Sequence, residues 1–243
     1  MKTHKHSFEI ERDIKVFGTV YDVAPAVAVL IIVHDVFEHR FLYQPLIEKF
    51  NAQQIAVVSY DLRGHHNTLV DKTTGHLSEE GILGDLLEVI SMTQREYQNI
   101  PITLMGGRIS SWLINKVLPL AEVDRIIVAD IAEAPKLLRL RKLVSSLLPK
   151  KQKSPFTKNK SQSSDPYVGR PLSNAGYYTM CSLLLSEPVS INYPLIVLML
   201  GESQESELLT ARKEYYQKCG LYNVSILLDQ DASFENIVSF IIH

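Results

Sequence analysis

Short apolar runs rich in β-branched residues alternate with longer stretches of helical spacing along most of this chain, and that alternation limits the folds open to it. The runs that we predict as buried strands are 27–33, 55–60, 102–105, 125–129, 195–200 and 224–228. The stretches with helical apolar spacing are 40–51, 79–98, 110–118 and 205–219. Residues 15–22 are expected to form an antiparallel edge hairpin with the segment before them. The pattern predicts a mostly parallel sheet of about eight strands with helices on both faces.

The length and composition fit one large α/β domain. The chain has 243 residues, of which 46% are hydrophobic and 21% charged, so it can bury a full core. A formal net charge of −2 gives no reason to expect nucleic acid as a partner. The N-terminus lacks the apolar stretch of a signal peptide, and no apolar run is long enough to cross a bilayer. With only two cysteines, we expect a cytoplasmic protein with reduced thiols.

One region differs from the rest in composition and is predicted to be an insertion. Residues 137–170 contain nine Lys or Arg residues against one acid, Asp165. Within this region, 137–148 carries apolar residues on one helical face, and the stretch near 149–165 is basic, polar and expected to be mobile. We therefore expect a lid over 131–188, which interrupts a core formed by 1–130 and 189–243.

The segment 104–111 is the most informative one for chemistry. It reads Leu-Met-Gly-Gly-Arg-Ile-Ser-Ser and is expected to pass from a buried strand through a sharp turn into a helix. Arg108 falls at the tip of that turn. A guanidinium is protonated at physiological pH and cannot attack a carbonyl carbon, so this tip carries no nucleophile.

Several other motifs point to a known family. Residues 31–39 read IIVHDVFEH and are followed by a Tyr-x-Pro-Leu segment at 43–46, and residues 57–65 read VVSYDLRGH. Gly75-His76 and Asp85-Leu86 fit the next segment of the same pattern. These motifs resemble the monoacylglycerol lipase and lysophospholipase branch of the α/β-hydrolases, which is serine aminopeptidase-like. The resemblance covers the chain from about residue 25 to its end and implies an α/β-hydrolase fold, a lid at the insertion, and esterase or lipase chemistry.

The resemblance also implies a Ser–His–acid triad, and this chain departs from it at each position. Arg108 stands where the family has its nucleophilic serine in a Gly-x-Ser-x-Gly turn. Gln204 stands at the position of the acid, and Phe234 at that of the histidine. We therefore expect that serine-hydrolase catalysis has been lost.

The oxyanion hole that the resemblance implies is altered as well. One donor would be the backbone N–H of Ile109, and the other would come from the loop after His34. The family has glycines in that loop, whereas this chain has Asp35, Val36 and Phe37. These side chains narrow the approach of a substrate, and a carboxylate at Asp35 would repel a developing oxyanion.

Arg108 has two interpretations. It is either an anchor for an anionic ligand near a helix N-terminus, in a site shared with Asp35 and Phe37, or a replacement held by a salt bridge with Asp35 or Glu202. Two serines, Ser110 and Ser111, are fallback nucleophiles, although packing alone favours a small residue at 110. No metal and no cofactor are expected, because the histidines lack metal-ligand spacing.

Three functions therefore stay open. The first is a homologue that has lost serine-hydrolase catalysis and binds an acyl or anionic ligand. The second is an active esterase or lipase that uses a displaced serine. The third is an interaction module whose basic lid contacts a protein or an anionic membrane surface. Nucleic acid is not expected, because no aromatic residues interleave with the lysines of the lid.

Overall fold

The computed structural model describes residues 3–69, 75–129, 139, 142, 151–152, 165–201, 207–228 and 231–243. Most of the predicted lid over 131–188 lies outside these residues, including nearly all of its predicted helix and of its basic stretch. Gln204 also lies outside them.

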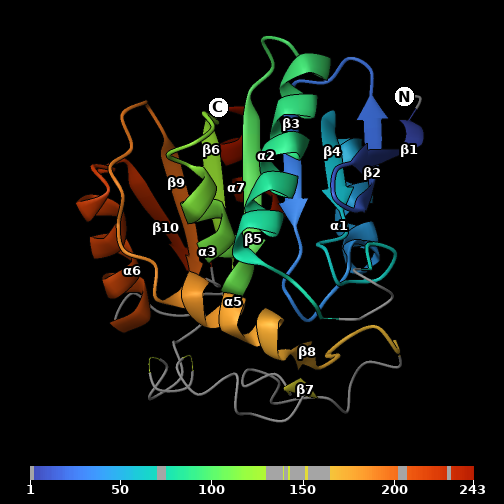
Figure 1. Ribbon diagram of the computed structural model, residues 1–243. Coiled ribbons are helices and arrows are strands. Elements are labelled where there is room, and N and C mark those ends of the chain that lie inside the picture. The colour runs from blue at the N-terminus through green and yellow to red at the C-terminus, as the bar shows by residue number, and fades with distance from the viewer. Residues whose placement is uncertain are drawn as a thin grey trace.

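Eight strands of the described chain form one sheet in the order β1-β2-β4-β3-β5-β6-β9-β10 (Figure 1). They are β1 (Thr3–Glu11), β2 (Lys15–Val23), β3 (Ala28–Val33), β4 (Ile55–Tyr60), β5 (Ile102–Gly107), β6 (Arg125–Ala129), β9 (Ile196–Gly201) and β10 (Val224–Leu228). All neighbours from β4 to β10 are parallel, whereas β2 pairs antiparallel with both β1 and β4. Two short strands, β7 (Lys151–Gln152) and β8 (Leu172–Ser173), form a separate antiparallel pair. The predicted sheet and its edge hairpin are both confirmed.

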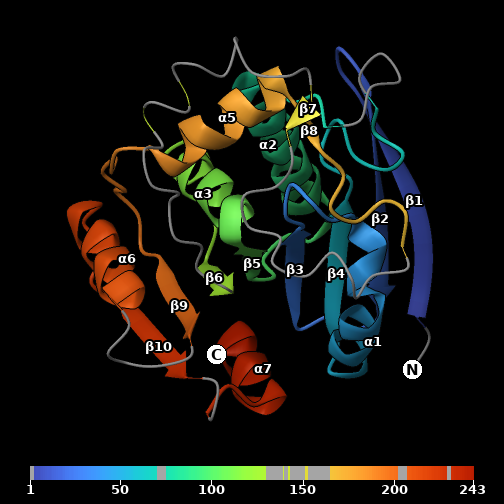
Figure 2. The ribbon, with the colours of Figure 1, turned by 90° about the horizontal axis from the view of Figure 1, so that it is seen from below.

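Helices cover both faces of this sheet (Figure 2). They are the 3-10 helix η1 (Arg40–Tyr43) and the α-helices α1 (Gln44–Ala52), α2 (Glu79–Glu96), α3 (Arg108–Val117), α5 (Asn174–Leu184), α6 (Glu207–Lys218) and α7 (Phe234–Ile242). A large core includes side chains of α2, α3, α5 and α6, and a smaller one includes side chains of α1 and α7. The central strands β3 and β4 are buried at every residue, which explains their continuous apolar runs. None of the described helices is both long and apolar enough to span a membrane.

Two loops at the same edge of the sheet position the predicted site. β3 ends at Val33 and continues into the loop 34–39, and β5 ends at Gly107 and continues into α3. Val33 pairs with Gly106 in the parallel β3–β5 ladder. Because parallel strands end at the same edge, the loop 34–39 and the start of α3 lie beside each other.

Candidate functional site

Arg108 lies at a sharp turn between β5 and α3, as the sequence predicts. Its φ of 46° is in the left-handed region, which a residue with a side chain rarely adopts. Gly106 must lack a side chain here, since a Cβ atom would lie 2.8 Å from both Ser110 Oγ and Ile114 Cδ1. The helix begins at Arg108, two residues earlier than predicted. The strained turn of a nucleophile elbow is therefore present, with a guanidinium at its tip.

The two fallback serines both use their hydroxyl groups to hold this turn. Ser110 Oγ accepts a hydrogen bond from the Gly107 N–H at 3.0 Å and donates to the Gly107 carbonyl oxygen at 2.8 Å. Ser111 Oγ donates to the Arg108 carbonyl oxygen at 2.7 Å. Both residues are 1% exposed, so neither hydroxyl faces an open site.

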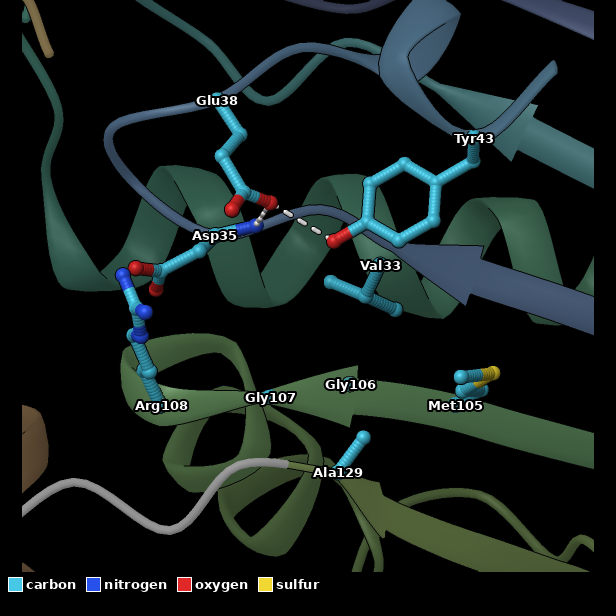
Figure 3. A pocket seen from close by; sticks show the side chains of 9 residues that line it. All are labelled: Val33, Asp35, Glu38, Tyr43, Met105, Gly106, Gly107, Arg108 and Ala129. Carbon is cyan, nitrogen blue, oxygen red and sulfur yellow. Dashed lines mark hydrogen bonds between the residues drawn. The ribbon is translucent and has the colours of Figure 1, made fainter. Parts of the chain in front are cut away.

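Asp35 accepts a hydrogen bond from the backbone N–H group that the family resemblance assigns to an oxyanion hole. The Ile109 backbone N–H donates to Asp35 Oδ1 at 3.0 Å. The Arg108 guanidinium points toward the same carboxylate (Figure 3). The two unusual residues of the predicted site therefore face each other, and the carboxylate of Asp35 is bonded to the N–H group that the family resemblance assigns to the oxyanion hole.

A buried histidine fixes the loop that carries Asp35. The Nδ1 atom of His34 lies 2.7 Å from the Asp35 carbonyl oxygen, and Nε2 accepts a hydrogen bond from the Leu62 N–H at 2.9 Å. Burial holds the pKa of His34 well below its usual value, so the ring is neutral and donates from Nδ1. The loop 34–39 is thereby attached to the segment after β4.

The Asp35 carboxyl group has an unusual affinity for protons. Burial, followed by the nearby charge of Glu38, raises its pKa from 3.8 to about 7. The N–H groups of Val36 and Ile109 and the charge of Arg108 act in the opposite direction. A carboxyl group with this pKa changes its charge close to neutral pH.

A cavity of about 100 Å³ lies beside Arg108 (Figure 3). It is lined by Val33, Asp35, Glu38, Tyr43, Met105, Gly106, Gly107, Arg108 and Ala129. Within it, Tyr43 donates a hydrogen bond to Glu38 Oε2 at 2.6 Å, and the Asp35 N–H lies 3.4 Å from the same oxygen. Burial and Glu38 hold the pKa of Tyr43 well above its usual value.

Not all predicted site residues line this cavity. Val36 and Phe37 are 2% and 4% exposed and belong to the large core instead. Phe234 is the first residue of α7 and packs against Phe50 in the last turn of α1, with 5.1 Å between the ring centres. The structure thus brings Arg108, Asp35 and Ile109 together and places Phe234 elsewhere.

Glu38 and Tyr43 are the site residues that sequence reasoning missed. Both stand in the motif that carries the family resemblance, but no role was expected for either. The only available signal was the acid three positions after Asp35, which by itself is ordinary for a loop. Among the described residues, no group of three His, Cys, Asp or Glu side chains is placed to hold a metal ion.

The fold and its strand-to-helix turn define an α/β-hydrolase, and solved structures agree with this class. A carboxyl esterase from Bacillus coagulans has a TM-score of 0.79 at 17% identity, covering 100% of both chains. A monoglyceride lipase from Saccharomyces cerevisiae has a TM-score of 0.76 at 12% identity, covering 96% of this chain and 92% of its own. A monoacylglycerol lipase from Paleococcus ferrophilus has a TM-score of 0.65 at 16% identity, covering 100% and 99%.

The family can be stated more narrowly. The model of the family described as serine aminopeptidase S33 matches residues 24–179, which is more than half of the chain. This chain therefore belongs to the serine aminopeptidase S33 family, within the lipase- and esterase-like α/β-hydrolases. No protein of curated function matches the sequence.

Proposed function

We propose that this protein is an α/β-hydrolase homologue that has lost serine-hydrolase catalysis and keeps a small ligand site at its former catalytic turn. The observation that carries the proposal is the hydrogen bond from the Ile109 N–H to the Asp35 carboxylate beside Arg108. An oxyanion hole acts by offering free donors to negative charge as that charge develops. In this protein the Ile109 N–H already donates to the Asp35 carboxyl group, which carries a negative charge when it is ionised.

The loss of hydrolysis rate that follows when an oxyanion-hole donor is unavailable supports the proposal. Removing a single oxyanion-hole donor slows hydrolysis by roughly 10²–10³-fold in enzymes that have their full triad. In this chain the nucleophile position is Arg108, and both nearby serines are engaged in bonds that hold the turn. The residue at the predicted histidine position, Phe234, packs on α1. None of these contacts therefore favours catalysis by a displaced serine.

The ligand and the lid contacts expected from the sequence stay predictions. An acyl chain would need more room than the described cavity offers, since about 100 Å³ is below the roughly 300–1,000 Å³ of ordinary ligand pockets. A contact between the basic lid and an anionic surface concerns residues that lie mostly outside the described chain.

The test is covalent labelling with a fluorophosphonate probe, read by intact mass, together with hydrolysis of a short-chain p-nitrophenyl ester. We expect no adduct and no turnover above buffer, while the Bacillus coagulans carboxyl esterase serves as the positive control. A stoichiometric adduct with turnover would contradict the proposal. In that case Ser110→Ala and Ser111→Ala variants, with peptide mapping, would identify the active serine.

A further inference from the structure

The edge strand β1 carries two exposed histidines on one of its faces. His4 and His6 are two residues apart, so their side chains point to the same side of the sheet. Lys5 between them points to the other side, where its Nζ atom lies over the ring of Tyr21. Two imidazoles at this spacing offer nitrogen ligands to the same region, and imidazole is the commonest protein ligand of metal ions.

Two carboxylates lie on the same face as these histidines. Asp22 of β2 is directly opposite His4 in the antiparallel ladder, which places the two Cβ atoms about 4.5–5.5 Å apart on one face. Glu96 is the last residue of α2, and its Oε1 atom lies 3.7 Å from His6 Nε2. Imidazole nitrogens and carboxylate oxygens together are a ligand set that zinc accepts.

The end of α2 adds to the preference for a cation. The last carbonyl oxygens of a helix carry partial negative charge, and Glu96 stands at this end. Tyr97, the next residue, donates a hydrogen bond from its hydroxyl to Asp22 Oδ1 at 2.9 Å. A carboxylate has two oxygens, so this bond orients Asp22 and leaves it able to act as a ligand. The neighbouring cation, Arg95, lies 3.2 Å from Glu88 instead.

We propose that this edge of the sheet binds a zinc ion through two histidines and two carboxylates. The four ligands are His4, His6, Asp22 and Glu96. The expectation of no metal rested on spacing along the sequence, which cannot show that a cross-strand acid and a helix end lie beside the two histidines. The site is distant in the chain from the turn at Arg108, so the inference is independent of the proposed function.

Binding requires rotation of side chains. No three histidine, cysteine or acidic side chains of the described chain already surround one point. The side chains of His6 and Glu96 are 51% and 37% exposed, and His4 is exposed as well, so they can turn without disturbing the core. Their present separation of 3.7 Å is longer than a hydrogen bond, so a metal ion between His6 and Glu96 displaces no strong contact.

The experiment is isothermal titration calorimetry of the full chain with zinc chloride, after treatment with EDTA and removal of the chelator. Magnesium chloride tests whether the carboxylates alone hold a cation, because magnesium prefers oxygen ligands. We expect one zinc ion per chain, with magnesium weaker by at least about tenfold. Zinc should also raise the temperature of thermal unfolding, because a ligand of the folded state stabilises that state.

Three variants assign the binding to this edge, and one serves as a control. His4→Ala and His6→Ala each remove a nitrogen ligand and should weaken zinc binding at least about tenfold. Asp22→Asn removes a charged ligand and should weaken it several-fold. His243→Ala removes an exposed histidine at the other end of the chain and should leave zinc binding unchanged.

The cysteines are the other zinc ligands that the experiment must separate. Cys181 and Cys219 are both buried. Cobalt(II) in place of zinc distinguishes them, because thiolate ligands give an intense charge-transfer absorption in the near ultraviolet, whereas imidazole and carboxylate do not. We expect the cobalt complex to lack this absorption.

Each opposite result overturns the inference. It fails if zinc does not bind, if magnesium binds as tightly, or if cobalt shows thiolate ligation. It also fails if both histidine variants bind zinc like the unaltered chain. Because His4 and His6 are exposed, their variants should unfold at the temperature of the unaltered chain when both are metal-free. Weaker zinc binding at an unchanged unfolding temperature then reports the lost ligand and not a lost fold.

Discussion

Arg108 is held in a backbone conformation that its own side chain disfavours. A left-handed residue with a Cβ atom costs about 1–2 kcal/mol. The neighbours of Arg108 impose the conformation, because Ser110 is bonded to both backbone groups of Gly107 and Gly106 has no room for a side chain. The turn therefore keeps its shape without a serine at its tip.

Replacing Arg108 tests this strain. Arg108→Gly should be more stable than Arg108→Ala by about 1 kcal/mol, because only glycine accepts the left-handed conformation without a steric cost. Both variants remove the guanidinium, so their difference isolates the backbone term. Urea unfolding of the two variants measures it, and equal stabilities would contradict a left-handed residue at 108.

The charge of Asp35 should make stability depend on pH. The folded pKa of about 7 lies above the ordinary value of 3.8, so the folded state binds more protons between these values and stability falls as pH rises through them. The total loss from this group is at most on the order of 4 kcal/mol.

Asp35→Asn removes that loss while keeping an acceptor for Ile109. The variant should gain stability relative to the unaltered chain as pH rises from about 4 to about 7. Urea unfolding at several pH values gives the difference. A stability difference that stays constant with pH would show that Asp35 titrates normally in the folded protein.

At the scale of elements, the start of α3 depends on a side chain that faces inward. Ser110 is the third residue of this helix, and its hydroxyl bonds the N–H and the carbonyl oxygen of Gly107, the residue before the helix. Ser110→Ala should lower the free energy of unfolding by about 1 kcal/mol, as loss of a helix cap does. Thermal unfolding measures this. A loss of esterase signal without a loss of stability would instead assign Ser110 a chemical role.

Most elements could be predicted from the sequence because their periodicity reflects burial. The predicted bounds of β4, β6 and β10 are those observed, and the other predicted strands differ by one or two residues. Helices α5 and α7 were missed. α5 is buried along most of its length, so it lacks the polar face that makes helical periodicity visible.

The site was only partly predictable for a different reason. Motif spacing located Arg108, Asp35 and Ile109, because a strand, a tight turn and a helix leave little freedom in their positions. The orientation of Glu38 toward the cavity involves a hydrogen bond from the hydroxyl of Tyr43, which lies in η1. The position of Phe234 depends on the packing of α7 against α1, which no local pattern encodes.

At the scale of the whole molecule, one buried carboxylate joins three parts of the chain. Asp85 in α2 has no exposed side-chain surface and accepts hydrogen bonds from Arg63 at 2.7 and 2.8 Å. It also lies 3.3 Å from the Arg12 guanidinium, in the turn between β1 and β2. Arg63, in the segment after β4, bonds Asp13 of that same turn. The edge hairpin, the loop after β4 and α2 therefore share one network.

Replacing Asp85 should lower the free energy of unfolding more than most single replacements on the buried face of α2. Asp85→Ala removes the buried carboxylate from Arg63, which keeps Asp13 as a partner, and should cost about 1–3 kcal/mol. Glu88→Ala is the control in the same helix, since its pair with Arg95 is exposed and should contribute less than about 1 kcal/mol. Guanidinium unfolding of both variants checks the contrast. Similar losses would show that the network carries no special weight.

The placement of Phe234 sets the direction in which this chain can evolve. Serine at 108 and glycine at 35 are single replacements, at positions that already lie at the turn and at the Ile109 N–H. A histidine at 234 would still begin α7 and contact the last turn of α1, away from that turn. Under the loss of catalysis that we propose, a return to ester hydrolysis would therefore require the segment after β10 to be rebuilt. Changes in the lining of the small cavity, by contrast, require only substitutions.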